Sequence, residues 1–214
     1  MHQVPRRIVF LFDIGGVIID WNNNDPIYRY IGNRYGIKSA VIKRVFTKNL
    51  RMLETGNISL HKFVTTCLAE VGLSLNKDYS AHELMVGPFA RIAKPRNDVL
   101  RLIRLLRRKG FPVYALTNTS FQHLEVMRQK GWLRYFEKTF ASCKIGYMKP
   151  EEEIFRIVLH RMKVSPNRVI FVDDNDNNVR AARRIGIVSS ILFRTGKDLE
   201  RRITKILEES SLQK

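Results

Sequence analysis

The stretch VFLFDIGGVIID, residues 9–20, constrains the fold of this chain more than any other part of its sequence. It begins with four consecutive apolar residues, a pattern typical of a strand that is buried on both faces of a parallel sheet. The apolar run ends on a carboxylate, Asp13, and the glycines Gly15 and Gly16 follow within three residues. In open α/β sheets, binding and catalytic groups lie beyond the carboxyl ends of the strands. The stretch therefore predicts a buried first strand whose end carries a functional carboxylate.

Beyond residue 94, the chain alternates between strand-like and helix-like patterns. Apolar runs bounded by turn residues predict the strands, and apolar residues at steps of three and four predict the helices. Strands are predicted at 8–13, 111–118, 167–174 and 187–193, a short strand and loop at 138–146, and helices at 97–110, 121–131, 150–162, 177–186 and 197–209. This alternation predicts an α/β fold, with a Rossmann-like parallel sheet and helices on both of its faces.

Residues 17–93 differ from the rest, because a polar, turn-rich patch is followed there only by helical patterns. Asp25 and Pro26 suit the N-cap and the first position of a helix. Four segments after them place apolar residues at helical spacing, and none resembles a strand. We therefore predict a core domain made of residues 1–16 and 94–214, and a small inserted α-helical domain made of residues 17–93.

The chain is strongly basic, with 38 Lys and Arg residues against 20 Asp and Glu residues and a net charge of +18 in 214 residues. A positive field attracts phosphates of any kind, from metabolites to nucleic acid. We favour a solvated basic surface, because the charges are spread along the chain. The two cysteines lie far apart, no leader-like pattern opens the sequence and no apolar run is long enough to span a bilayer. These features favour a cytoplasmic protein without a membrane partner.

Several polar residues fall at the predicted carboxyl ends of strands, which a parallel sheet brings to one edge. Each has an ordinary structural interpretation, since Asp often caps a helix, Thr often stabilises a turn and Lys is usually a solvated charge. Their joint placement on a βαβ framework favours a common site. The candidates are Asp13, Thr117, Asn118, Asp173 and Asp174, together with Lys149 just before a predicted helix.

Four motifs, FDIGGV, ALTN, GYMKP and VIFVDDNDNN, occur in this order along the chain. In sequence and order they resemble the motifs of the haloacid dehalogenase-like (HAD) hydrolases. The pair Asp173-Asp174 is similar to the phosphatase branch that includes bacterial glucose-1-phosphate phosphatase-like proteins and the phosphatase domain of soluble epoxide hydrolases. Haloacid dehalogenases themselves have a different first motif and a serine-rich fourth one. The resemblance makes the helical insert a cap domain over a HAD core.

This resemblance implies an Mg²⁺-dependent phosphatase that hydrolyses a small phosphorylated metabolite, with a sugar phosphate as one candidate. It makes Asp13 the nucleophile, which forms an aspartyl-phosphate that water hydrolyses. The implied metal ligands are the carboxylates of Asp13 and Asp174 and the backbone carbonyl of Gly15, all oxygen donors suited to Mg²⁺.

The resemblance also assigns the remaining polar residues of the four motifs. Lys149 pairs with the nucleophile and with the phosphoryl oxygens as a compact positive charge. Thr117 and the backbone N–H of Asn118 donate hydrogen bonds to the same oxygens. Asp173 orients its neighbours from behind, and Asn178 stands where many relatives have an acidic metal-supporting residue.

Gly15 departs from the family pattern, because most HAD phosphatases have an aspartate there that serves as general acid and base. The absence of a general acid typically costs about 10²–10⁴ in rate. Another acid can replace it, with Asp20 as the candidate and Asp25 behind it, or the leaving group can be one that scarcely needs a proton. The alternative is a catalytically impaired protein that binds a phosphorylated or nucleic-acid partner. We favour an active enzyme, since relatives of the paired-Asp branch also lack this acid.

The helical insert should close over the site and select the substrate. Tyr28, Arg51, His61 and Phe63 are candidates to face the pocket, although a core or surface position is the better explanation for each of them. Arg51 is the preferred candidate, because a guanidinium is useful near a phosphate. Nucleic acid is not favoured, because no aromatic residues for base stacking interleave with the basic helix predicted at 97–110. The sequence does not indicate an oligomeric state.

Overall fold

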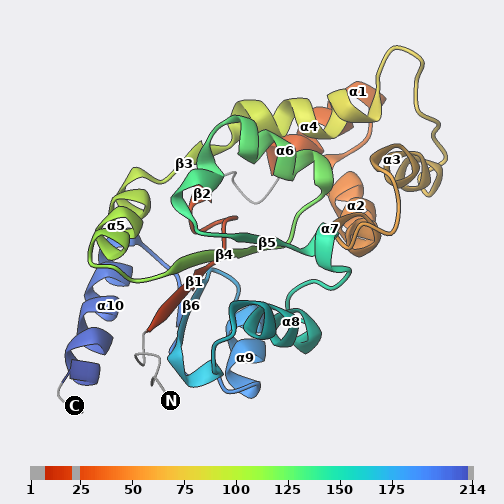
Figure 1. Ribbon diagram of the computed structural model, residues 1–214. Coiled ribbons are helices and arrows are strands. Elements are labelled where there is room, and N and C mark those ends of the chain that lie inside the picture. Colours follow the sequence, from red (N-terminus) through yellow and green to blue (C-terminus); the bar gives the residue numbers. More distant parts are fainter. Residues whose placement is uncertain (1–7, 21–24, 212–214) are drawn as a thin grey trace.

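The structure of the protein, a computed structural model, describes residues 8–20 and 25–211 (Figure 1). Its centre is a five-stranded parallel sheet with the strand order β5-β4-β1-β6-β7. The strands are β1 (Val9–Phe12), β4 (Val113–Thr117), β5 (Thr139–Ala141), β6 (Val169–Asp173) and β7 (Ser190–Leu192). The first strand of the sequence is thus the central strand of the sheet, as its uninterrupted apolar run requires.

Helices cover both faces of this sheet. Within β1, Phe10 and Phe12 point into a core shared with α5 and α10, while Leu11 points into a second core shared with α8 and α9. The helices and short helical turns after the insert are α5 (Asn97–Arg108), α6 (Phe121–Gln129), η2 (Trp132–Tyr135), α7 (Ser142–Ile145), α8 (Glu152–Met162), η3 (Pro166–Arg168), α9 (Asp176–Arg184) and α10 (Gly196–Ser211). The predicted α/β fold class is confirmed.

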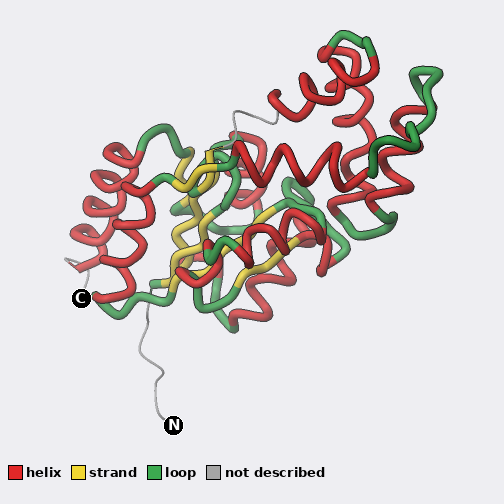
Figure 2. The backbone as a smooth tube through the Cα atoms, turned by 90° about the horizontal axis from the view of Figure 1, so that it is seen from above, coloured by secondary structure: helices red, strands yellow, loops and turns green. Residues whose placement is uncertain are grey.

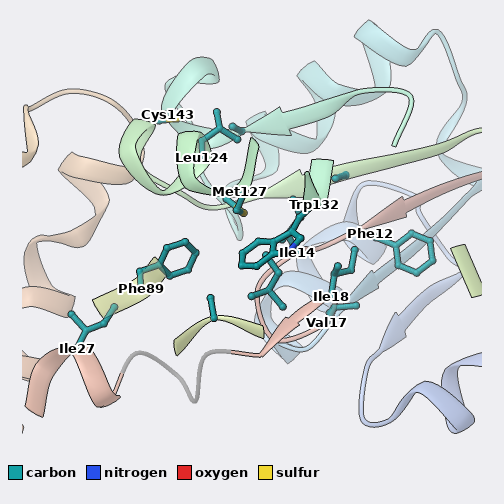
Figure 3. Close-up of a cluster of buried hydrophobic side chains, with 14 of the residues drawn as sticks. Phe12, Ile14, Val17, Ile18, Ile27, Phe89, Leu124, Met127, Trp132 and Cys143 are labelled. Carbon is teal, nitrogen blue, oxygen red and sulfur yellow. The ribbon is translucent and has the colours of Figure 1, made fainter. Parts of the chain in front are cut away.

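The helical insert forms a layer of its own beside α6 (Figures 1 and 2). Its helices are α1 (Asp25–Tyr35), α2 (Ser39–Glu54), α3 (Leu60–Ala69) and α4 (Ala81–Ile92). Ser59 caps α3, and Ser80 with Glu83 forms a capping box at α4, so local sequence defines where both helices begin. Apolar side chains of α1 and α4, including Ile27 and Phe89, belong to the same buried cluster as side chains of α6 (Figure 3).

Two short strands connect the helical insert to the core. β2 (Ile19–Asp20) pairs antiparallel with β3 (Lys94–Pro95), so the chain enters and leaves the insert at adjacent points. The sequence did not predict this pair, because two residues are too few to show an alternating pattern. The helical character of the insert agrees with the prediction, while the boundaries at residues 17 and 93 stay a prediction.

Two further expectations were incomplete. After β5 the chain forms the short helix α7 where a loop was expected, and the predicted turn-rich patch lies largely outside the described residues, in 21–24.

No helix in residues 8–20 and 25–211 combines the length and the apolar character that crossing a membrane requires.

Candidate active site

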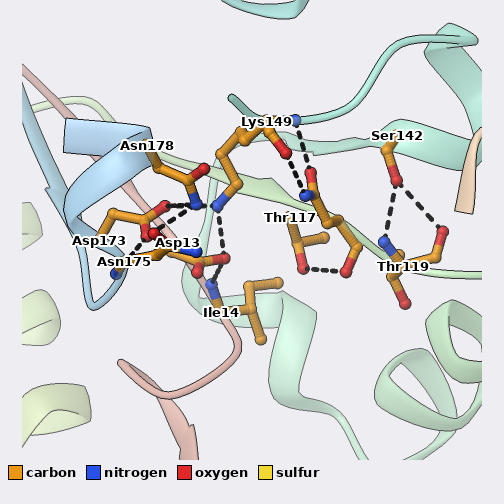
Figure 4. Close-up of polar contacts among 10 residues, drawn as sticks. Asp13, Ile14, Thr117, Thr119, Ser142, Lys149, Asp173, Asn175 and Asn178 are labelled. Carbon is orange, nitrogen blue, oxygen red and sulfur yellow. Dashed lines mark hydrogen bonds and ion pairs between the residues drawn. The ribbon is translucent and has the colours of Figure 1, made fainter. Parts of the chain in front are cut away.

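Lys149 and two aspartates form the centre of the candidate site at the carboxyl edge of the sheet (Figure 4). Asp13 follows β1 and Asp173 ends β6, and the parallel register of these neighbouring strands brings the two carboxylates together. The Nζ atom of Lys149 lies 2.9 Å from Oδ1 of Asp13 and 2.6 Å from Oδ2 of Asp173. All three side chains are buried. Residues separated by more than 130 positions in the sequence thus form one buried ionic cluster.

The charges of this cluster do not balance. Burial works against the charged form of Lys149, but Asp13 and Asp173 outweigh it and raise the pKa of Lys149, which is therefore protonated. Burial raises the pKa of Asp13, and the nearby Asp173 and Asp174 act in the same direction against the attraction of Lys149. One ammonium thus faces three carboxyl groups, an arrangement that favours the binding of a further cation.

Asp173 is fully engaged by the protein. Besides Lys149, it accepts hydrogen bonds from Nδ2 of Asn178, at 3.0 and 3.1 Å, and from the backbone N–H of Asn175, at 2.9 Å. Its position therefore suits the orientation of neighbouring groups. In the described part of the chain, Oδ1 of Asn178 is buried without a hydrogen-bond partner, while Nδ2 of the same amide is bonded to Asp173.

The remaining carboxylates fit a divalent metal. Single carboxylate oxygens of Asp13, Asp173 and Asp174 all lie within 4.8 Å of one another. Since Asp173 is saturated by internal hydrogen bonds, Asp13 and Asp174 retain oxygen atoms for a metal such as Mg²⁺, which prefers few carboxylates. Asp174 is also pressed against the loop after β1, because a Cβ atom on Gly16 would lie 2.5 Å from its Cγ. Gly16 has a φ of +71°, so glycine serves both the turn and the close approach.

Asn118 fixes the backbone of Lys149. Its Nδ2 donates to the carbonyl of Lys149 at 2.8 Å, and its Oδ1 accepts from the N–H of Lys149 at 2.9 Å. The hydroxyl of Thr117 is buried, and it lies 3.5 Å from the carbonyl oxygen of Asn118. The structure therefore places both residues beside Lys149, and their predicted role in phosphate binding stays a prediction.

Two other predicted residues follow β1, Gly15 in the turn after it and Asp20 at the end of β2. Gly15 forms an isolated bridge with Ile19, and the contact of its carbonyl with a metal stays a prediction. Asp20 makes an ion pair of 3.0 Å with Arg96, and both side chains are partly exposed. The structure thus gives Asp20 a cationic partner, while its role as a substitute acid stays a prediction.

A cavity lies between the helical insert and the core, with room for about 30 Å³ of water-sized contents. That volume is enough for a water molecule. Its lining consists of Ile27, Tyr28, Leu50, Leu53, Glu54 and Met85 from the insert, and Asn118, Thr119, Ser120 and His123 from the core. Asn118 links this cavity directly to Lys149.

Glu54 and His123 are the cavity residues that the sequence did not single out. Burial raises the pKa of Glu54 to about 7, against the attraction of Lys149. Burial lowers the pKa of His123 to about 4, and its ring stacks on Phe89 at a centroid distance of 4.3 Å. No motif marks either residue, because the cavity forms only when the insert packs on the core.

The candidates proposed within the insert occupy different environments. Tyr28 lines the cavity, Phe63 is buried in the insert core and His61 is exposed on α3. Arg51 does not line the cavity and instead makes a two-pronged ion pair with Glu151, at 2.8 and 3.1 Å. Arg51, the preferred phosphate-binding candidate, is therefore paired with the carboxylate of Glu151 from the core.

The sequence is similar to those of several known hydrolases. It is 30% identical over 140 residues to bifunctional epoxide hydrolase 2 of Rattus norvegicus, a match that covers 63% of this chain and 25% of that protein. The chain spans between 24% and 30% of the length of the three mammalian epoxide hydrolases it matches. It is 26% identical over 207 residues to D-ribitol-5-phosphate phosphatase of Bacteroides thetaiotaomicron, covering 92% of this chain and 97% of that protein.

Solved structures show a matching fold. A HAD family enzyme of Bacteroides thetaiotaomicron, in complex with magnesium and inorganic phosphate, superposes with a TM-score of 0.70 at 25% identity, covering 89% of this chain and 96% of that one. The family model for haloacid dehalogenase-like hydrolases matches residues 9–186. With its parallel sheet, its motif order and this match, the chain belongs to the haloacid dehalogenase-like hydrolases.

Proposed function

We propose that the chain is an Mg²⁺-dependent phosphatase that hydrolyses a small phosphorylated metabolite through an aspartyl-phosphate intermediate. The observation that carries this proposal is the convergence of Lys149 with Asp13, Asp173 and Asp174 at one edge of the sheet. Phosphoryl transfer depends mainly on positioning and on neutralising negative charge, and this cluster provides an ammonium and a carboxylate set for a metal.

Asp13 would act as the nucleophile. The backbone N–H of Ile14 donates to its Oδ1 at 2.6 Å and Lys149 contacts the same oxygen at 2.9 Å, so the carboxylate is held in one orientation. Attack by Asp13 forms a bond to phosphorus while the bond from phosphorus to the leaving oxygen breaks. Water then hydrolyses the acyl phosphate, releases inorganic phosphate and regenerates the carboxylate.

The residues around Asp13 would bind the phosphoryl group and the metal. Asp13 and Asp174, with the carbonyl of Gly15, would hold Mg²⁺, which neutralises phosphate charge when bound. Lys149 would pair with the phosphoryl oxygens, and Thr117 and the N–H of Asn118 would donate hydrogen bonds to them. Asp173 and Asn178 would keep Lys149 in place, as their hydrogen-bond network indicates.

A sugar phosphate or polyol phosphate is the proposed substrate class. Relatives that resemble this chain include the D-ribitol-5-phosphate phosphatase and a phosphorylated carbohydrates phosphatase of Thermotoga maritima, which is 26% identical over 184 residues. The cavity lining includes hydroxyl and carboxyl groups, from Tyr28, Ser120 and Glu54, and an opening of the insert would make them available to substrate hydroxyls, because the cavity itself has room for about one water molecule.

Hydrolysis of p-nitrophenyl phosphate, with Mg²⁺ and after chelation, tests this function. Wild type should require Mg²⁺, and Asp13→Asn should lower turnover by about 10³-fold or more, because the nucleophile is lost. Thermal unfolding of both proteins controls for folding. Equal turnover by both proteins would show that the site assignment is wrong. Absence of Mg²⁺-dependent turnover, with binding of phosphorylated ligands retained, would favour the impaired protein instead.

A further inference from the structure

The proposed reaction lacks a group that protonates the leaving oxygen, because Gly15 has no side chain. A carboxyl group is present on the other side of the cavity. Glu54 is the last residue of α2 and lines the cavity together with Asn118 and Thr119, which follow β4 in the core. Asn118 is hydrogen-bonded to the backbone of Lys149 and the charge of Lys149 acts on Glu54, so the cavity that Glu54 lines adjoins the ionic cluster.

Contacts on both sides of Glu54 show that the end of α2 lies against the core. Arg51, one turn earlier, pairs with Glu151, only two residues after Lys149. Two residues later, Gly56 lies so close to α7 that a Cβ atom there would be 2.5 Å from the carbonyl oxygen of Cys143. Glu54 therefore has a defined position relative to the loop that carries Lys149.

Glu54 is not engaged by the protein itself. Within residues 8–20 and 25–211, its carboxyl has neither a hydrogen-bond nor an ion-pair partner, and Lys149 is the cation whose charge acts on it. The side chain is only partly exposed, since it opens to the cavity while protein surrounds it. A partly buried carboxyl without an internal partner is suited to bind or protonate a ligand.

Compared with the titratable groups around it, Glu54 is the one whose pKa lies near neutral pH. Those facing it are Tyr28 from α1, Cys143 from α7, His123 from α6 and Lys149 from the loop before α8. Burial raises the pKa of Tyr28 and of Cys143, so both stay neutral at pH 7, and His123 is neutral above its lowered pKa. Burial brings the pKa of Glu54 to about 7 despite Lys149.

We propose that Glu54 is the catalytic acid that replaces the carboxylate missing at position 15, an inference that rests on the proposed phosphatase function. As Asp13 bonds to phosphorus and the leaving oxygen departs, the carboxylic acid of Glu54 gives its proton to that oxygen and an alcohol forms. Water then hydrolyses the aspartyl-phosphate, and Glu54 regains its proton from solvent. Release of phosphate leaves Asp13 free and Glu54 protonated again.

This assignment differs from the candidate that the sequence favoured. Asp20 is ion-paired with Arg96, whereas Glu54 has no such partner among the described residues and lines the cavity. Glu54 reaches the site from the insert, so the reaction would need the insert closed on the core.

The test compares two kinds of leaving group. The p-nitrophenolate anion leaves with little protonation, whereas an alkoxide must be protonated. Purified wild type, Glu54→Gln and Glu54→Asp are assayed with p-nitrophenyl phosphate and with ribitol 5-phosphate or glycerol phosphate. Glu54→Gln should lower kcat for the alkyl phosphates by about 10²–10⁴ and change kcat for p-nitrophenyl phosphate by less than tenfold. Glu54→Asp should recover part of the alkyl phosphate activity.

A matched control and a pH profile complete the experiment. Glu70→Gln changes an insert carboxylate that pairs with Lys48, and it should leave both activities unchanged. The decline of alkyl phosphate hydrolysis above about pH 7 in wild type should be absent in Glu54→Gln. If Glu54→Gln does not fold, the pH profile of alkyl phosphate hydrolysis by Glu54→Asp is compared with that of wild type instead, and it should differ from it.

The proposal is wrong if Glu54→Gln lowers both activities equally, leaves both unchanged, or if wild type hydrolyses p-nitrophenyl phosphate but no alkyl phosphate. Failure of the underlying phosphatase function looks different. In that case wild type hydrolyses neither substrate, or Asp13→Asn hydrolyses p-nitrophenyl phosphate as well as wild type does.

Discussion

Lys149 is joined to Asp173 by a contact of 2.6 Å between Nζ and Oδ2, and solvent reaches almost none of either side chain. Lys149→Met would leave Asp173 and Asp13 buried without a cation. Breaking a buried ion pair by removing one partner typically costs about 3–5 kcal/mol of stability. We expect a loss of this size at pH 7, measured by urea unfolding without metal.

The matched control for this prediction is Lys48→Met, which removes the mainly exposed partner of Glu70. Exposed ion pairs contribute about 0–1 kcal/mol, so the control should unfold almost like wild type. Similar losses in both variants would contradict the view that burial makes Lys149 essential to the cluster.

Gly16 and Gly36 form a second matched pair. Both have positive φ, +71° and +66°, so alanine is strained at either position, by about 1–3 kcal/mol. A Cβ atom meets nothing within 4 Å at Gly36 but collides with the Asp174 carboxylate at Gly16. Gly16→Ala should therefore be the less stable variant and should displace a proposed metal ligand.

Metal titration separates the two effects at Gly16. We expect the Mg²⁺ concentration for half-maximal activity to rise at least tenfold in Gly16→Ala and to stay unchanged in Gly36→Ala. An unchanged Mg²⁺ requirement in Gly16→Ala would argue against Asp174 as a ligand.

The ion pair between Arg51 and Glu151 connects the insert to the core, yet 55% of the Arg51 side chain is exposed. Such a pair adds little stability, and a double-mutant cycle with Arg51→Ala and Glu151→Ala should give a coupling energy below about 1 kcal/mol. Urea unfolding of the four proteins measures it. A coupling above about 2 kcal/mol would mean that the pair stabilises the insert on the core.

His123 should make stability depend on pH. Its pKa is about 4 in the folded protein and 6.5 in the unfolded chain, so between these values the unfolded chain binds the extra proton. Stability should fall as the pH drops from 6.5 toward 4, by up to about 3 kcal/mol. His123→Gln should lose correspondingly less over this interval in urea unfolding. Parallel pH dependences of both proteins would contradict a neutral, buried His123.

Much of the core could be predicted because its signals are local. The apolar runs of β1 and β6 need burial on both faces, and the parallel order then brings Asp13 and Asp173 to one edge. Lys149 was also anticipated there. Its two-carboxylate contact depends on Asn118, which holds the lysine backbone from another strand end.

The parts that the sequence did not reveal depend on packing between segments. Glu54 looks like one more charged residue near the end of an amphipathic helix, and only the approach of α2 to α7 places it in the cavity. The sequence showed that Arg51 carries a guanidinium, which suggested a phosphate ligand. It could not show that the partner of this guanidinium is Glu151, 100 residues away. The β2–β3 pair is too short for any periodicity to appear.

The adjacency of β2 and β3 has an evolutionary consequence. Ile19 lies opposite Pro95 and Asp20 opposite Lys94, so the whole helical segment is attached at a single place. A short turn is sufficient to join two neighbouring strand ends, and the entropy of loop closure grows only slowly with the length of what is inserted. Descendants of such a chain can therefore shorten, enlarge or exchange the helices without rebuilding the core that carries Asp13 and Lys149.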